Sequence, residues 1–388
     1  MQRDTYDSDH EDFRQAVRAF IARDVQPHHG RWENEGLIER SAWEAAGQQG
    51  LIGIAVPEEF GGGGTPDFRY RLIIMEEMAA AAANSFNAGL SVQDDLVIPY
   101  LVDLGSQEQK ARWLPGLCTG TRIGSLAMTE PGTGSDLRSI RTTAVSSGDG
   151  WILDGQKTFI TNGMHADVVI VFARTNPDPS NAAFSLFLVD TLSEGFRRGR
   201  KLEKVGLRGN DTAELYFDQI HLPREALLGV EGEGFTHLMD RLPRERLAIA
   251  ATSLAASSAA FEWTKTYCFE RKAFGRPVGD FQNTRFTLAE IATELDLGWA
   301  FLDRAVHLLN AEELSAVDAA KAKWWMTALH QRVVDHCVQL HGGYGYMLEY
   351  PIARAFLDAR IQPIYGGTNE IMKEIIGRDI ADRTRSQV

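Results

Sequence analysis

Cysteine is scarce in this sequence, and long apolar runs are absent. The three cysteines, Cys118, Cys268 and Cys337, lie far apart and form no CxxC pair. This number and spacing exclude a zinc ribbon and give no disulfide framework, so we expect a reducing compartment. No run of 18 apolar residues occurs, and the sequence therefore predicts no helix that spans a membrane.

Basic residues are outnumbered by acidic ones. The chain has 40 Lys and Arg against 53 Asp and Glu, a formal net charge of -13. This charge disfavours a nucleic acid or an anionic membrane as the main partner, although a few local basic residues can still bind a small anion. The first seven residues, MQRDTYD, are polar and acidic, unlike a signal peptide or a transit peptide. We therefore expect a cytoplasmic protein that binds no nucleic acid.

The common nucleotide and metal motifs are missing as well. No GxGxxG follows a predicted strand, and no GxxxxGK[ST] occurs. His330, His336 and His341 match neither HExxH nor a zinc-finger spacing, so we expect no metal site. Strands and helices do not alternate along the chain, which argues against a Rossmann fold.

Three regions differ in their periodicity. Residues 1–120 have helical spacing of apolar residues and an Ala-rich segment, which predicts a helical domain. Residues 121–231 contain short β-branched and apolar runs between turn signals, which predicts a β domain of about six to eight strands. The clearest runs are 151–153, 168–172, 184–189 and 214–222.

Residues 232–388 are helical again, in long elements that break near 275–277, 310–314 and 341–345. Such lengths are typical of an antiparallel bundle. The predicted fold is therefore an α+β multi-domain chain. It has an N-terminal helical domain, a middle β-barrel or β-sandwich domain and a C-terminal four-helix bundle.

Five short clusters carry residues that suit ligand binding. They are AMTEPGTGSD at 127–136, DGQKTFITNG at 154–163, RKAFGRP at 271–277, QLHGGYG at 339–345 and IYGGTNEI at 364–371. Taken singly, each is more simply explained as a turn, a hairpin or a helix end than as a ligand site. In the last cluster, Thr368 or Asn369 is a candidate N-cap for the final helix.

Together, in this order and with this domain arrangement, the five clusters resemble the acyl-CoA dehydrogenase family along essentially the whole chain. The resemblance is closest to its long-chain members. It implies FAD as cofactor and α,β-dehydrogenation of a fatty acyl-CoA to trans-2-enoyl-CoA, as in fatty acid β-oxidation. It also implies electron transfer to an electron-transfer flavoprotein, and a homotetramer (a dimer of dimers) whose subunits share the FAD sites.

The catalytic base departs from the usual family pattern. Most members carry a glutamate in a YEGT sequence, which reads Tyr365-Gly366-Gly367-Thr368 here. The long-chain and isovaleryl branches carry the glutamate on an earlier helix, where this chain has Glu245. The resemblance therefore implies Glu245 as the base, with the Gly366 N–H still available to polarise the thioester carbonyl.

The residues around Glu245 support this assignment. Leu238, Leu242, Glu245 and Ile249 follow one another at spacings of four, three and four, which places the carboxyl on an apolar helix face. A polar group buried there without compensation costs roughly 2–7 kcal/mol. Burial should also raise the pKa of Glu245 and make it a better base. The alternative is an i,i+4 ion pair with Arg241.

The resemblance also assigns the other site residues. It implies that Met128, Thr129, Gly134, Ser135, Phe159 and Thr161 contact the flavin, and that Thr368 and Glu370 close the site. It implies that Arg271, Phe274, Gln282, Gln339 and Gly343 reach FAD from a neighbouring subunit. It implies that Ser135, Leu242, Arg246 and Gly367 contact the acyl-CoA.

Three alternatives stay open at this point. Isovaleryl-type enzymes share the base position, so a branched acyl group remains compatible with the sequence, and chain length is not set. An acyl-CoA oxidase of the same fold would pass its electrons to dioxygen. A non-catalytic acyl-CoA-binding subunit would bind the same ligands, although retention of Glu245, Arg271 and Thr368 argues against it.

Overall fold

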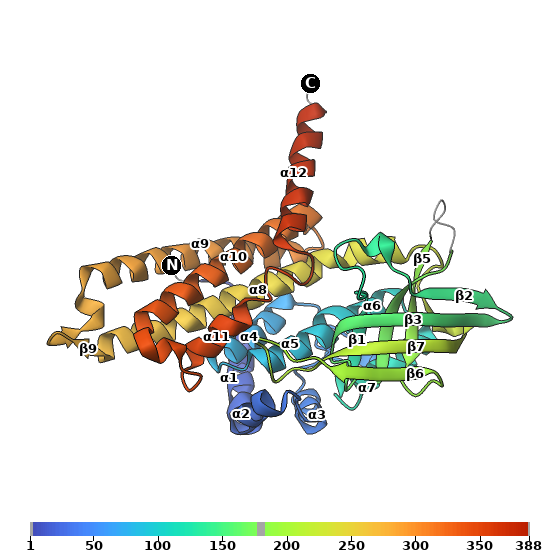
Figure 1. The fold of residues 1–388 in the computed structure, drawn as a ribbon, viewed down its shortest axis with the longest axis horizontal. Coiled ribbons are helices and arrows are strands. Elements are labelled where there is room, and N and C mark those ends of the chain that lie inside the picture. The colour runs from blue at the N-terminus through green and yellow to red at the C-terminus, as the bar shows by residue number, and fades with distance from the viewer. Residues whose placement is uncertain (1–2, 177–182, 387–388) are drawn as a thin grey trace.

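Helices, strands and helices follow one another along the chain, which confirms the predicted fold class (Figure 1). The computed structural model describes residues 3–176 and 183–386. The N-terminal helices are α1 (Ser8–Phe20), η1 (Ile21–Val25), α2 (Gln26–Glu35), α3 (Arg40–Gln48), η2 (Glu58–Phe60), α4 (Phe68–Ala80), α5 (Asn84–Ser91), η3 (Val92–Val97), α6 (Ile98–Leu104) and α7 (Gln107–Cys118). Trp32, Trp43 and Phe86 are buried at the centre of this region.

The middle region forms one twisted sheet. Its strands are β1 (Gly124–Ala127), β2 (Thr143–Ser147), β3 (Gly150–Thr161), β4 (Val168–Arg174), β5 (Phe184–Asp190), β6 (Phe196–Lys201), β7 (Thr212–Pro223) and β8 (Leu227–Leu228), with η4 (Leu137–Ser139) and η6 (Arg224–Ala226) between them. The order is β6-β7-β3-β2-β4-β5-β8, and β1 pairs in parallel with β4. The long β3–β7 pairing shifts register between Lys157 and Ile160, so the chain is irregular at Phe159.

The C-terminal region is built on three long helices. They are α8 (Gly234–Glu270), α9 (Gln282–Asn310) and α10 (Ala316–His341). A hairpin of β9 (Lys272–Ala273) and β10 (Arg276–Pro277), followed by η7 (Val278–Asp280), joins α8 to α9. After α10 come η8 (Gly342–Tyr346), α11 (Pro351–Ala359) and α12 (Asn369–Arg385).

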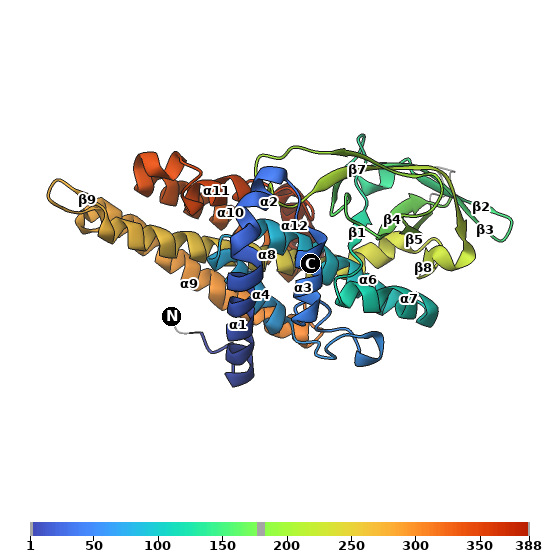
Figure 2. The same cartoon turned by 90° about the horizontal axis from the view of Figure 1, so that it is seen from below.

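Helix α8 links the two ends of the molecule. It runs from the sheet through the bundle to the β9–β10 hairpin, and both views show the sheet and the hairpin at opposite ends (Figures 1 and 2). Helix α4 packs against it, and Phe68, Leu72 and Met75 of α4 share a buried cluster with Leu247 and Leu254 of α8. The first half of α8 is therefore held between the N-terminal helices, the sheet and the bundle. Within the described residues, no helix combines the length and apolarity that crossing a membrane requires.

Candidate active site

Glu245 lies in the interior of α8, on the face that its sequence spacing predicts. Leu238, Leu242 and Ile249 are buried on that face, and Glu245 itself is only 8% exposed. Arg241 does not pair with it; the Arg241 guanidinium pairs with Asp103 at 3.2 Å and donates to the His237 carbonyl oxygen. Among the described residues, the Glu245 Oε2 atom has no hydrogen-bond partner. The alternative of an i,i+4 ion pair is therefore wrong.

Burial sets the acidity of this carboxyl group. It raises the pKa of Glu245 from 4.5 to about 7, and the charge of Asp95 adds to the rise. The positive charges of Arg246 and Lys323 oppose it without cancelling it. A carboxylate with a pKa near neutrality is a stronger base than an exposed one, yet it remains substantially ionised at pH 7.

The turn between α11 and α12 meets this carboxyl group. Gly366 and Gly367 have φ angles of +63° and +89°, which a glycine adopts without steric cost. A Cβ atom built on Gly366 would lie 3.5 Å from Glu245 Oε1. The structure thus brings Gly366 and Glu245 to one place, although 121 positions of the sequence separate them. Leu242 and Arg246 are both buried beside Glu245 on α8.

The cluster after β1 is held by a buried lysine. Lys157 Nζ donates to the Met128 carbonyl oxygen at 2.9 Å and pairs with Glu130 Oε1 at 2.9 Å. The Thr158 N–H donates to the Thr129 carbonyl oxygen, also at 2.9 Å. These bonds join the 127–136 and 154–163 clusters and leave Ser135 exposed beside them.

Phe159 stands out in this part of the sheet. Its backbone is left-handed, with φ of +60°, and its side chain is 66% exposed. An exposed aromatic ring on strained backbone gains nothing from contacts within the chain, which points to a ligand that covers it. At Gly134, a built Cβ would meet no heavy atom within 4 Å, so the backbone there is open to close approach. Thr161, at the end of β3, is partly buried, and its carbonyl oxygen accepts from Ser125 Oγ.

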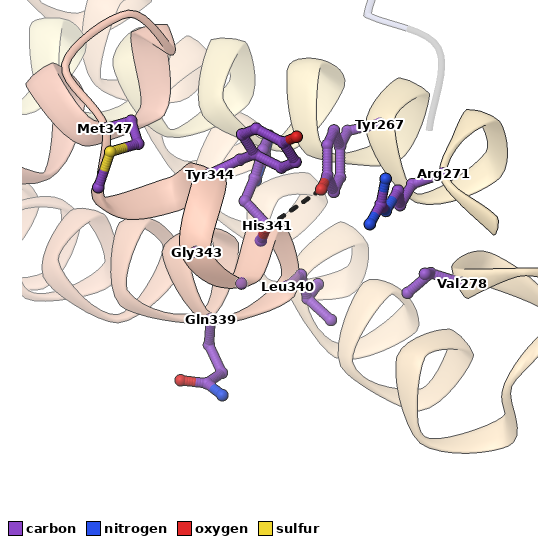
Figure 3. A pocket seen from close by; sticks show the side chains of 10 residues that line it. Tyr267, Arg271, Val278, Gln339, Leu340, His341, Gly343, Tyr344 and Met347 are labelled. Carbon is purple, nitrogen blue, oxygen red and sulfur yellow. Dashed lines mark hydrogen bonds between the residues drawn. The ribbon is translucent and has the colours of Figure 1, made fainter. Parts of the chain in front are cut away.

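A second group of the predicted cofactor residues surrounds a pocket at the hairpin end of the bundle (Figure 3). The pocket has a volume of about 460 Å³, and Arg271, Gln339 and Gly343 line it. The Tyr267 hydroxyl donates to the His341 carbonyl oxygen at 3.2 Å and ties α8 to the end of α10. Phe274, in the hairpin, is 96% exposed and has a φ of +52°.

The structure does not bring the two groups together within one chain. Met128, Thr129 and Phe159 belong to the sheet end, and Arg271 and Phe274 to the opposite end (Figures 1 and 2). Gln282 is exposed at the start of α9, near the second group. At the start of α12, Thr368 caps the helix by accepting from the Ile371 N–H, as predicted, and Glu370 lies exposed in the first turn.

Comparison with known proteins decides the family. Three family models match: the N-terminal domain of acyl-CoA dehydrogenase at residues 7–121, its middle domain at 125–220 and its C-terminal domain at 232–381. The mitochondrial long-chain specific acyl-CoA dehydrogenase of Sus scrofa is 48% identical, over 97% of this chain and 87% of that protein. The chain belongs to the acyl-CoA dehydrogenase family.

Solved structures of the family agree in fold. An acyl-CoA dehydrogenase from Geobacillus kaustophilus is 45% identical with a TM-score of 0.94, covering 98% of this chain and 100% of that one. A glutaryl-CoA dehydrogenase from Mycobacterium smegmatis, solved in complex with FADH2, is 30% identical with a TM-score of 0.90. The match covers 97% of this chain and 95% of that one. The predicted family and enzyme class are confirmed: the chain is an oxidoreductase of the CH–CH class, and FAD is the cofactor of its family.

The residues of this chain fit such a cofactor. Phe159 and Phe274 present exposed aromatic rings from left-handed backbone, and Gly134 and Gly343 both leave open space where a side chain would stand. Arg271 forms no ion pair within the described part of the chain, so its guanidinium is available for a phosphate. Nowhere in residues 3–176 and 183–386 do three or more His, Cys, Asp or Glu gather as a metal ion would require.

Sequence reasoning missed several polar residues of the site. Lys157 and Lys323 are fully buried cations, and each donates to a carbonyl oxygen of a candidate ligand-binding loop. The Tyr100 hydroxyl on α6 is buried without a hydrogen-bond partner in the described chain, and burial and the charge of Glu245 raise its pKa. The burial of Lys323 could have been predicted from the sequence, because Lys323 occupies an apolar helix face just as Glu245 does.

Proposed function

We propose that this member of the acyl-CoA dehydrogenase family oxidises a fatty acyl-CoA to trans-2-enoyl-CoA, with Glu245 as the base that removes the α proton. One observation carries the proposal. The buried carboxyl group of Glu245, one oxygen of which has no hydrogen-bond partner among the described residues, lies 3.5 Å from the Cβ position of Gly366, where most members of the family carry their base. The glutamate has thus moved to α8, and its carboxyl group still reaches the same point.

The chain's own residues supply the proton chemistry. Glu245 Oε takes the α proton, and its pKa of about 7 suits a base that works near neutral pH. The Gly366 N–H polarises the thioester carbonyl as negative charge develops on its oxygen. This donor belongs to the main chain, so the loss of the side chain at position 366 leaves it in place. Leu242, Arg246 and Gly367 flank Glu245 and would orient the acyl-CoA with Ser135.

The cofactor would be held by both groups of residues. When bound, FAD supplies a flavin that accepts the hydride from the β carbon. Met128, Thr129, Gly134, Ser135, Phe159 and Thr161 would hold the flavin end, with Thr368 and Glu370 closing the site. Arg271, Phe274, Gln282, Gln339 and Gly343 would hold the pyrophosphate and adenosine of FAD in a neighbouring subunit. Their position at the opposite end of the chain supports this sharing (Figure 1).

The partners and the substrate follow from this assignment. We propose a homotetramer, built as a dimer of dimers, in which each FAD takes residues from two subunits. A long straight acyl chain is the proposed substrate, in line with the long-chain enzyme of Sus scrofa, and an electron-transfer flavoprotein is the proposed acceptor.

A reducing compartment fits the cysteines, since Cys118, Cys268 and Cys337 are all free and buried. We propose the cytoplasm as that compartment, and cell fractionation with an antibody tests it. Recovery of the protein with another compartment would contradict this location.

Anaerobic titration with acyl-CoAs tests the proposed function. Protein loaded with FAD should lose its oxidised flavin absorbance on addition of a long straight acyl-CoA, and an added electron acceptor should restore it. A ladder of straight and branched acyl-CoAs separates long-chain from isovaleryl-type specificity. Rapid peroxide formation in air would instead identify an oxidase, and binding without bleaching of the flavin would identify a non-catalytic subunit. Failure to bind FAD at all would contradict the proposal.

A further inference from the structure

Lys323 is a buried cation in the first half of α10. Its side chain is fully buried, and Ala319, Ala320 and Met326 are buried on the same helix face. No carboxylate forms an ion pair with it in the described part of the chain. An ammonium group is costly to bury in such surroundings, so its presence calls for a role beyond packing.

The ammonium group holds the turn that meets Glu245. Lys323 Nζ donates to the Gly367 carbonyl oxygen at 2.7 Å and lies 3.3 Å from Asn369 Oδ1. Asn369 Oδ1 also accepts from Thr327 Oγ1 at 3.0 Å. Side chains of α10 are therefore hydrogen-bonded both to the turn and to the first residue of α12. A turn of two glycines has little stiffness of its own. The bond from Lys323 therefore fixes the Gly366–Gly367 backbone in position.

Charged side chains of two other helices act on this ammonium group. Glu245 and Arg246 face Lys323 from α8, and Glu370 faces it from α12. Burial first, and Arg246 second, lower the pKa of Lys323 to about 8, while Glu370 and Glu245 oppose the fall. At neutral pH the side chain is still mainly protonated, and its charge favours the ionised form of the Glu245 carboxyl group.

We infer that Lys323 is a positioning residue for the reaction proposed above: its ammonium group holds the Gly366–Gly367 turn against Glu245 and places a positive charge beside that carboxyl group. The inference rests on the proposed function and adds to it a residue that does not touch the reacting atoms. One ammonium group would thus act on both the Gly366 N–H, which is the proposed oxyanion donor, and the Glu245 carboxyl group, which is the proposed base.

The pH profile of kcat/KM separates this role from a purely structural one. Lys323→Met removes the charge and the bond to Gly367. The acid limb of the kcat/KM profile of this variant should therefore move to higher pH. The ratio of kcat/KM at pH 6 to its maximal value should fall about threefold or more. The matched control is Lys321→Met, on the same helix, where the exposed Lys321 pairs with Asp318. Its acid limb should coincide with that of the unmodified protein.

Two further outcomes keep the test decisive. If Lys323→Met does not fold with FAD, Lys323→Gln removes the same charge with a polar side chain and takes its place. An acid limb that stays unmoved in the neutral variant would overturn the inference, even if thermal stability falls. A lack of turnover in the unmodified protein would instead contradict the proposed function.

Discussion

At the scale of single residues, burial determines what Glu245 can do. An exposed glutamate is a weak base, whereas burial in α8 raises the pKa of Glu245 to about 7. The same burial leaves Oε2 without a hydrogen-bond partner among the described residues, so this oxygen is available to a substrate proton. Arg246 and Lys323 limit the rise of the pKa and keep part of the population ionised.

The pH dependence of kcat/KM should report this carboxyl group. A base works only when ionised, so kcat/KM should rise with pH through about 7 and fall about tenfold per pH unit well below that value. Steady-state assays from pH 5 to 8 with a saturating electron acceptor measure the limb. A profile that is flat across this range would show that no group with such a pKa removes the proton.

The sequence alone predicts the position of some residues of the candidate site and not of others. The burial of Glu245 could be predicted because a carboxyl group interrupts an apolar helix face, and its approach to Gly366 because the resemblance assigns both positions to the base. Lys157 could not be assigned a role, because its bond to the Met128 carbonyl oxygen depends on how β3 lies against the loop after β1. Such long-range contacts leave no local periodicity in the sequence.

At the scale of elements, strands with apolar signals were predicted and those without were missed. The runs at 168–172 and 184–189 match β4 and β5, whose side chains are almost all buried. Strand β6 has the sequence FRRGRK and is mostly exposed, so its composition carries no signal of a strand. The turn predicted at Asp154-Gly155, between the run at 151–153 and a second strand, is wrong: β3 continues from Gly150 to Thr161, and Gly155 lies at an irregularity in its pairing with β7.

The turn before α12 gives a test at this scale. Gly366→Glu in a Glu245→Gln background should restore only part of the activity, because the new Cβ would lie 2.2 Å from Ile249 Cδ1 and on left-handed backbone. Adding Ile249→Val removes that methyl group and should raise kcat further. Steady-state assays compare the variants, with Ile249→Val alone as the control. Equal activity in the double and triple variants would show that Ile249 does not limit the rescue.

At the scale of the whole molecule, the separation of the two candidate cofactor groups is the main feature. The sheet end carries the residues assigned to the flavin, and the hairpin end carries the pocket with Arg271, Gln339 and Gly343 (Figures 1 and 3). The two groups therefore lie at opposite ends of one chain. The second chain that we propose would cover Phe159 and Phe274, which are exposed in the isolated chain.

Mixing two inactive variants tests this sharing. Glu245→Gln lacks the base, and Arg271→Ala lacks the proposed phosphate ligand of the neighbouring site. When the two are dissociated and reassociated in equal amounts, about a quarter of the sites should regain both groups. Flavin bleaching per subunit measures the recovery, and each variant reassociated alone is the control. A mixture no more active than its components would show that each FAD is bound within one chain.

The most direct measurement of the central claim is the rate of flavin bleaching in Glu245→Gln. The variant keeps the size of the side chain and removes its basicity, so it should bind FAD and acyl-CoA as before. In an anaerobic stopped-flow experiment with saturating acyl-CoA, we expect its bleaching rate to fall about 10²–10⁴-fold. A rate within a few-fold of that of the unmodified protein would contradict the assignment of Glu245 as the base.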